Sequence, residues 1–176
     1  MNNPMLQRNQ WQRSERTARV IFSRVAVVAP YDGVPTLMFR AANQRRNQIL
    51  EAQISVSLLR DESTAEGGTM RRFHDLSLAR RRTPMFSLTW TVMHPIDAAS
   101  PLHRADGQTL EAENAQVVIT LSGVDETFAQ TIHARHIYAA GEIVWNCRFA
   151  DVFDRLTDGS RVIDYGRFHE VVPINE

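Results

Sequence analysis

The feature that most constrains the fold of this chain is an alternation of apolar and polar residues. In residues 86–92 (FSLTWTV) the apolar positions are Phe86, Leu88, Trp90 and Val92. Successive side chains of a β-strand point to opposite faces, so the stretch has one apolar and one polar face. We predict a central core strand here. It ends at Pro95, because proline lacks the N–H that a strand ladder needs.

A second stretch, residues 49–60, has the same period of two. One face carries Leu50, Ala52, Ile54, Val56 and Leu58, and the other carries Glu51, Gln53, Ser55 and Ser57. A helix would scatter these apolar positions around its axis, so a strand is the better interpretation.

Further strands are predicted at residues 18–30, 36–42, 70–78, 116–124, 131–140, 142–153 and 162–165, and one or two helical turns at 109–115, with Thr109 as the cap and Ala112 inside. Turn signals separate these short segments, and no sustained helix or repeat interrupts them. The sequence therefore predicts an all-β fold, an immunoglobulin-like (E-set) antiparallel β-sandwich. We expect residues 1–17 to be a flexible lead-in or membrane-proximal linker, 18–170 the sandwich domain and 171–176 a tail.

Composition narrows the function classes. The 176 residues include 20 basic and 20 acidic side chains, so net charge gives no reason to expect a nucleic-acid partner. Cys147 is the single cysteine, which excludes an internal disulfide, and its phase with Ile143, Trp145 and Phe149 predicts burial. No stretch approaches the roughly 20 apolar residues needed to span a bilayer.

Catalytic and metal-binding patterns are missing. The nucleophile elbow, the phosphate-binding loop and the dinucleotide fingerprint do not occur, so we predict that the protein is not an enzyme. His133 and His136 are three residues apart on a predicted strand, which places them on opposite faces and argues against a shared metal. We expect no metal site and no cofactor.

The arginine residues Arg16, Arg19, Arg45 and Arg46 flank the first predicted strands. Guanidinium groups presented at one edge of a sandwich suit phosphate groups or an anionic membrane surface, and the alternative is a solvated rim. Glu51 lies on the polar face of its strand, which usually means simple solvent exposure. In a symmetric ring the same residue would give a ring of carboxylates that concentrates cations.

Several stretches together resemble the inward-rectifier potassium channels, most closely the bacterial KirBac group. They are residues 20–28 (VIFSRVAVV), 32–33, 36–52 (TLMFRAANQRRNQILEA), 72–76 (RFHDL), 86–102, 125–136 (DETFAQTIHARH), 142–145 (EIVW) and 164–169 (DYGRFH). The resemblance covers only the family's cytoplasmic domain, at the cytoplasmic side of the cell membrane. The sequence shows neither the two membrane helices nor the selectivity filter, so we interpret it as an excised regulatory domain rather than a natural homologue without a pore.

The resemblance implies a homotetramer that joins the channel's transmembrane domain and extends the potassium pathway. Glu51 matches an acidic position that binds Mg²⁺ or polyamines. The matching pathway constriction loop comprises Gly123, Val124, Asp125, Glu126, Thr127, Phe128, Ala129 and Gln130. Arg19, with Arg16, falls where the family's basic residues meet anionic phosphoinositide headgroups. Arg45 falls on a basic position that the family links to lipid-dependent gating, and we group its neighbour Arg46 with this lipid and gating set.

Two departures from the family predict a weaker polyamine site. Ser122 stands where strong rectifiers carry a second glutamate, and an acidic loop is replaced by residues 79–82 (ARRR). The alternative function is a stand-alone β-sandwich module that binds a protein or a carbohydrate.

Overall fold

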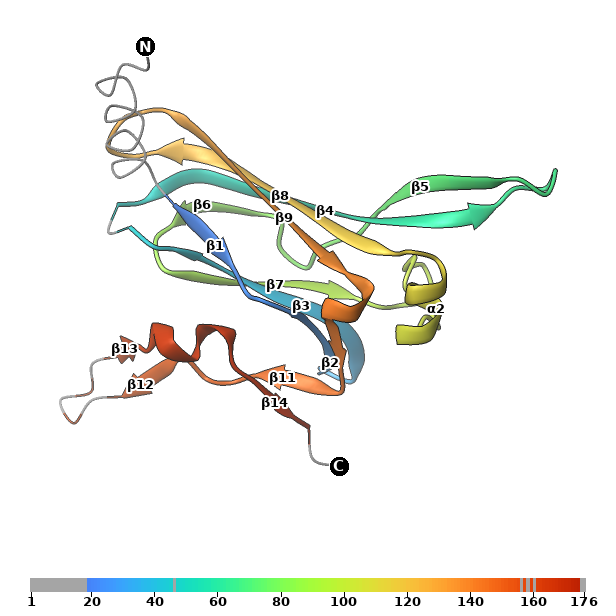
Figure 1. The fold of residues 1–176 in the computed structure, drawn as a ribbon. Coiled ribbons are helices and arrows are strands. Elements are labelled where there is room, and N and C mark those ends of the chain that lie inside the picture. The colour runs from blue at the N-terminus through green and yellow to red at the C-terminus, as the bar shows by residue number, and fades with distance from the viewer. Residues whose placement is uncertain (1–18, 46, 156, 158, 160, 175–176) are drawn as a thin grey trace, which may run out of the picture.

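The computed structural model describes residues 19–45, 47–155, 157, 159 and 161–174, and two β-sheets stacked face to face make up most of them (Figure 1). The first sheet contains β1 (Val20–Phe22), β2 (Ala26–Tyr31), β3 (Val34–Asn43), β7 (Thr89–Pro95) and β10 (Ile143–Trp145). The second contains β4 (Ile49–Ser63), β5 (Thr69–Asp75), β6 (Arg82–Phe86), β8 (Gln116–Asp125) and β9 (Thr131–Ala139). The predicted all-β fold is confirmed, and within these two sheets only β10, which runs parallel to β2, departs from antiparallel pairing.

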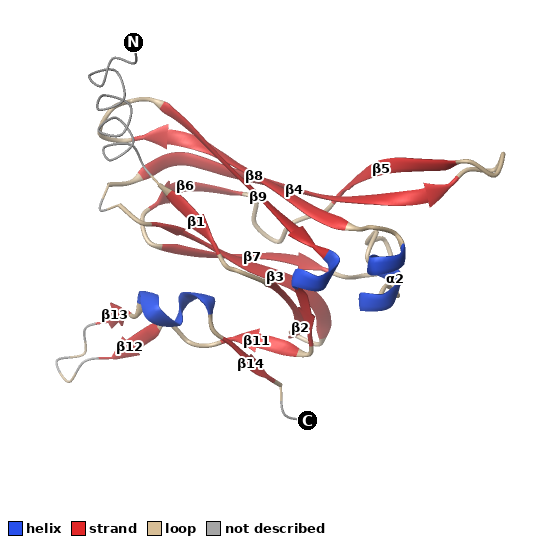
Figure 2. Cartoon of the chain, in the orientation of Figure 1, coloured by secondary structure: helices blue, strands red, loops and turns tan. Residues whose placement is uncertain are grey.

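Helical structure is confined to short turns among the described residues: α2 (Gly107–Ala112), η1 (Ala140–Glu142) and η2 (Tyr165–His169) (Figure 2). The prediction of Thr109 as the helix cap is wrong. Asp106 is the N-cap, and its carboxylate accepts a hydrogen bond from the Thr109 N–H at 2.8 Å. An aspartate satisfies a free N–H of the first turn in this way. None of the described helices is long and apolar enough to cross a membrane.

The core lies between the sheets and follows the predicted alternation. Ile54, Val56 and Leu58 of β4 are at most 3% exposed, and they face buried residues of the opposite sheet in one continuous cluster. Tyr138 of β9 is fully buried and joins the layers, because its hydroxyl donates to the Ser23 carbonyl at 2.7 Å. That partner satisfies a polar group that would otherwise be buried at a cost.

The prediction of one continuous strand at residues 86–92 is wrong. The chain passes from β6, paired with β4, to β7, paired with β3, and changes sheet at residues 87–88. Leu88 is consequently 53% exposed, whereas Trp90 and Val92 are buried. Alternation is a property of one strand, so a crossover between sheets resets which residues face the core.

Two other predicted strands are also divided. Residues 18–30 contain β1 and β2 with a break at residues 23–25, and residues 142–153 contain β10, β11 (Cys147–Phe149) and the start of β12 (Phe153–Arg155). Cys147 is only partly buried, because it belongs to β11 and not to the sheet that holds β10.

The C-terminal segments form a third layer against the outer face of the first sheet (Figure 1). β11 pairs with β14 (Val171–Pro173), and β12 pairs with β13 (Arg161–Ile163). Val27, Ala29 and Met38 are buried beneath this layer. The side chain of Arg40 enters it and lies over the ring of Phe149, with Cζ 4.6 Å from the ring centroid. The stretch that we interpreted as a tail therefore begins with a paired strand.

Candidate functional site

Two of the four candidate arginines line one surface groove. Arg19, before β1, and Arg45, after β3, border a groove of about 810 Å³ whose lining also includes Tyr165 and His169 of η2. Among the described residues of that lining, none is an aspartate or a glutamate. Burial lowers the pKa of His169, and the nearby charge of Arg24 acts in the same direction. The groove therefore suits an anionic ligand, with the arginines as its cationic groups. Arg16 and Arg46 lie outside the described residues.

One backbone hydrogen bond joins the two sides of the groove, and a side-chain acceptor fixes the loop on one of them. The N–H of Gln44 donates to the carbonyl of Arg19 at 2.9 Å, and the N–H of Arg45 donates to Asn43 Oδ1 at 3.0 Å. A side-chain oxygen that binds the N–H two residues on is an Asx turn, a common way for asparagine to fix a loop. The position of Arg45 is thus set by Asn43 at the end of β3.

Residues 43–45, 47 and 48, here called the linking segment, connect the groove to the predicted constriction loop. Asn43 Nδ2 donates to the carbonyl of Asn47 at 2.7 Å, and Asn47 Nδ2 donates to Asp125 Oδ2 at 2.8 Å. Gln48 and Glu126 then exchange two hydrogen bonds: the N–H of Glu126 donates to the Gln48 carbonyl at 3.0 Å, and the N–H of Gln48 to Glu126 Oε2 at 3.2 Å. A continuous series of directional contacts therefore joins Arg45 to the loop.

The predicted constriction loop is shorter in the structure than in the sequence interpretation. Residues 123–125 belong to β8, and only residues 126–130 leave the sheet. Asp125 is fully buried, and its Oδ1 accepts hydrogen bonds from the N–H groups of Thr127 at 2.8 Å and Phe128 at 3.2 Å. Phe128 itself is 43% exposed. Asp125 is therefore an anchor of the loop, whereas Phe128 is available to a neighbour.

Glu51 occupies a β-bulge. The pairing of β4 with β8 shifts register between Leu50 and Gln53, and the φ of Glu51 is +50°. A non-glycine residue with positive φ is uncommon and marks a locally imposed backbone conformation. The bulge explains why Leu50 is only partly buried although it fits the predicted apolar face, while Ile49 is fully buried.

Gly123 makes the bulge possible. A Cβ at this position would lie 2.5 Å from Ile49 Cγ2 and 3.0 Å from the Leu50 carbonyl oxygen. Only a residue without a side chain fits opposite the bulge. The close contact between Gly123 and residues 49–50 therefore fixes the positions of both Glu51 and the base of the loop.

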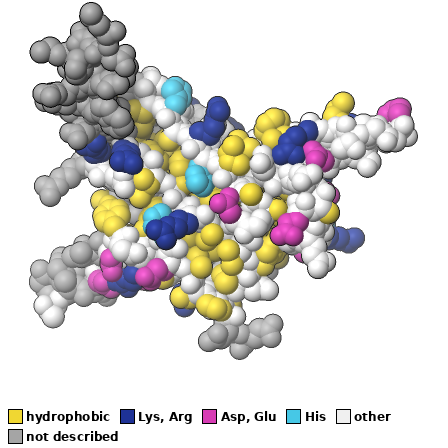
Figure 3. All heavy atoms as spheres, in the orientation of Figure 1, with side chains coloured by type: hydrophobic (Ala, Val, Ile, Leu, Met, Phe, Trp, Pro, Cys, Tyr) yellow, Lys and Arg dark blue, Asp and Glu magenta, His cyan; other side chains and the backbone are white. Residues whose placement is uncertain are grey.

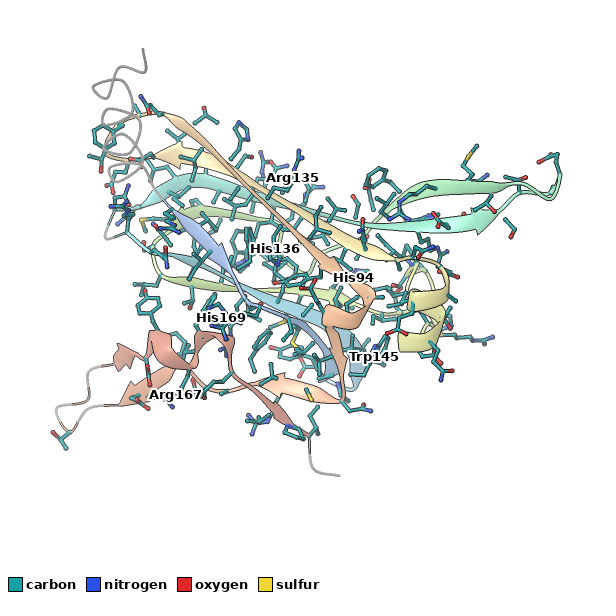
Figure 4. All side chains as sticks on the ribbon, viewed as in Figure 1. His94, Arg135, His136, Trp145, Arg167 and His169 are labelled. Atoms are coloured by element: carbon teal, nitrogen blue, oxygen red, sulfur yellow. The ribbon has the colours of Figure 1, made fainter. Side chains whose placement is uncertain are left out.

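The outer face of the second sheet around Glu51 carries several basic residues. One cross-strand row consists of Arg82, Gln53, Ser122 and His133, and the next of Ser55, Thr120 and Arg135. Figure 4 shows Arg135 on the outer side of β9 and His136 between the sheets, consistent with the predicted opposite faces of His133 and His136. Among the ion pairs of the described residues, none involves Arg82 or Arg135.

No group of three or more histidine, cysteine or acidic residues in the described part of the chain is arranged to hold a metal ion. His136 stacks on Phe22 with ring centroids 5.4 Å apart, and its Nε2 is buried without a hydrogen-bond partner. Figure 3 shows basic, acidic and hydrophobic side chains interspersed on the face in view.

Sequence reasoning missed Tyr165 and His169 as groove residues and Asn47 as a link. Asn47 and Asp125 are 78 positions apart, and no local pattern marks them as neighbours. The motif DYGRFH at residues 164–169 carried the only usable signal, through the family resemblance.

Comparison with known proteins gives a match to one family model and to several relatives. The model of the family described as "Inward rectifier potassium channel C-terminal domain" matches residues 20–176. The chain is 48% identical over 155 residues to the inward rectifier potassium channel Kirbac3.1 of Paramagnetospirillum magnetotacticum, covering 88% of this chain and 52% of the relative. It is 36% identical over 167 residues to the G protein-activated inward rectifier potassium channel 3 of Mus musculus, covering 93% and 42%. The chain thus spans about half or less of the length of these relatives.

Proposed function

Because this chain belongs to the inward rectifier potassium channel family and carries its C-terminal domain, we propose that it is the cytoplasmic gating and ion-pathway domain of a prokaryotic potassium channel. In this proposal four copies form a ring below the channel's transmembrane domain, and potassium passes along the shared axis. The observation that carries the gating function is the series of hydrogen bonds from the groove through Asn47 to Asp125 and the loop.

The proposed ligand of the groove is an anionic phosphoinositide headgroup at the membrane face. Two guanidinium groups support this choice, as does the absence of carboxylates among the described residues of the lining. A ligand shifts a conformational equilibrium only by its differential affinity for the two states. Here the differential contact would be made at Arg19 and Arg45, and the linking segment would carry the displacement to residues 126–130.

Vesicle binding tests the ligand. The 176-residue chain is sedimented with phosphatidylcholine vesicles that contain a phosphoinositide. At about 1 kcal/mol per basic residue near an anionic surface, Arg19→Gln and Arg45→Gln should each weaken binding roughly fivefold. Arg148→Gln is the matched control, because Arg148 is exposed on β11 and lines no part of the groove. Equal losses in all three variants would contradict a specific groove.

Hydrogen exchange tests the coupling. Asn47→Ala removes the donor that reaches Asp125 and leaves both groove arginines in place. In the unmodified chain, phosphoinositide vesicles should change amide exchange in residues 126–130. In Asn47→Ala the vesicles should still bind, and the change in the loop should be lost. If loop exchange still responds to the vesicles in this variant, the proposed route of coupling is wrong.

Glu51 is the proposed cation site of the pathway, with Mg²⁺ or a polyamine as its ligand. The exposed side chain and its place on the outer face support this assignment, whereas the nearby Arg82, His133 and Arg135 should weaken it. Spermine binding measured by calorimetry should fall in Glu51→Ala and stay unchanged in Glu66→Ala, an exposed glutamate in the β4–β5 turn. Unchanged binding in Glu51→Ala would remove this site.

A further inference from the structure

A second cavity lies at the end of the first sheet. Its described lining residues differ from those of the groove. It has a volume of about 460 Å³, and its walls come from β2 and β3, from the chain between β7 and α2, and from the end of β10. Val28, Ile96 and Leu102 provide buried apolar surface there. The loop that covers the cavity is fixed, because the N–H of Ile96 donates to the Pro35 carbonyl at 2.7 Å. Cavities of this size and character hold small ligands in many proteins.

The polar groups of the cavity gather at one end. His103 and Arg104 line it and are exposed, and no ion pair among the described residues involves either of them. The nearest carboxylate in sequence, that of Asp106, accepts from Thr109 N–H and Oγ1, both at 2.8 Å. The described residues of the lining therefore include the guanidinium group of Arg104 and no acidic side chain.

An unsatisfied donor lies at this same end. Trp145 lines the cavity, and its indole Nε1 is buried without a hydrogen-bond partner. A Cβ at Gly107 would be 3.5 Å from this atom, so the indole nitrogen lies beside the first residue of α2, three positions from Arg104. Figure 4 places Trp145 at this end of the molecule. Buried indole N–H groups usually have a partner, so an unpaired one indicates an acceptor that is supplied by something else.

From the apolar wall, the unpaired indole N–H and the cationic rim, we propose that this cavity binds a small amphipathic carboxylate, with its chain or ring against Val28, Ile96 and Leu102. The carboxylate pairs with Arg104, and the indole of Trp145 turns from its buried position beside Gly107 so that Nε1 donates a hydrogen bond to the ligand. Charge-assisted hydrogen bonds of this kind are stronger than neutral ones, and they set the orientation of the ligand. The site is independent of the proposed gating function, since none of its described lining residues also lines the groove.

The probe is decanoate, which has an apolar chain and a carboxylate. Two control compounds are measured beside it: decanol, which lacks the charge, and acetate, which lacks the long apolar chain. The chain has three tryptophans, so its indole ¹H–¹⁵N spectrum is simple and Trp145→Phe assigns the signal of Trp145. Decanoate should bind at a ratio of one to one and shift the Trp145 indole signal in a saturable manner. Decanol should bind at least tenfold more weakly, and acetate should leave the signal unmoved.

Two variants decide the role of the polar end. Arg104→Gln should weaken decanoate binding about tenfold, and Trp145→Phe, which keeps an aromatic ring, about fivefold. Arg135→Gln, an exposed arginine on the outer face of β9, should leave binding unchanged. The proposal is overturned if decanoate does not shift the Trp145 signal, if decanol binds as tightly as decanoate, or if Arg104→Gln and Arg135→Gln weaken binding equally.

Discussion

Between the two sheets the contacting side chains are mostly apolar, whereas at the groove edge hydrogen bonds hold the linking segment to the loop. Ile54, Leu58 and Ile119 are at most 1% exposed and belong to one continuous cluster. Asn47 and Gln48 instead reach residues 125 and 126 through amide and backbone groups. Apolar packing is close and non-directional, so it stabilises one arrangement as a whole. A few hydrogen bonds of modest net strength suit an edge that, in the proposed gating function, adopts two arrangements.

The largest loss of stability is expected from a substitution between the two sheets. Ile119→Ala should lower the free energy of unfolding by about 2–5 kcal/mol, because it leaves a cavity in close-packed surroundings. Ile137→Ala on β9 is the control, since Ile137 is 44% exposed and should cost much less. Urea denaturation of both variants measures the difference. If both variants lost the same free energy of unfolding, the apolar packing between the sheets would not be the main source of stability.

An intermediate loss of stability is expected at Gly123, where the packed interior meets the hydrogen-bonded edge. Gly123→Ala brings a methyl group against Ile49 and the backbone of β4, and such overpacking typically costs about 1–3 kcal/mol. Gly141→Ala is the control, because nothing lies within 4 Å of an added Cβ there. Urea denaturation should show a lower free energy of unfolding for Gly123→Ala and an unchanged one for Gly141→Ala. An unchanged value for Gly123→Ala would mean that the bulge at Glu51 can relax.

The smallest effect is expected from pH. Burial lowers the pKa of His136, opposed in part by the charge of Glu142, and burial likewise lowers the pKa of His94. An unfolded histidine takes up a proton near pH 6.5, whereas these folded ones resist until lower pH. The unfolded state therefore binds more protons in that window, so stability is complete above about pH 6.5 and falls as the pH drops toward the folded pKa.

A titration of stability against pH tests this assignment. His136→Phe keeps an aromatic group beside Phe22 and should reduce the loss of stability on acidification. An unaltered pH dependence in His136→Phe would place the titrating groups elsewhere.

The fold class could be predicted because alternation is local. The inward positions of β4 from Ala52 to Leu58 follow from the period of two alone, as do the opposite faces of His133 and His136. The strand breaks could not be predicted in this way. Whether residues 87–88 continue a strand or cross between sheets depends on the partners of β6 and β7, which lie elsewhere in the chain.

The candidate site was likewise predictable from the sequence only in part. Arg19, Arg45 and Glu51 could be singled out from charge and from a family resemblance, but their settings could not. The groove requires η2, more than 110 positions beyond Arg45, to lie beside it, and the link requires Asn47 to meet Asp125. By itself the sequence determined the alternation, and hence the β class, because side-chain direction in a strand depends on neighbouring residues only. Tertiary structure decided the groove, the bulge and the link, because hydrogen bonds and close contacts between distant segments exist only after the sheets have packed.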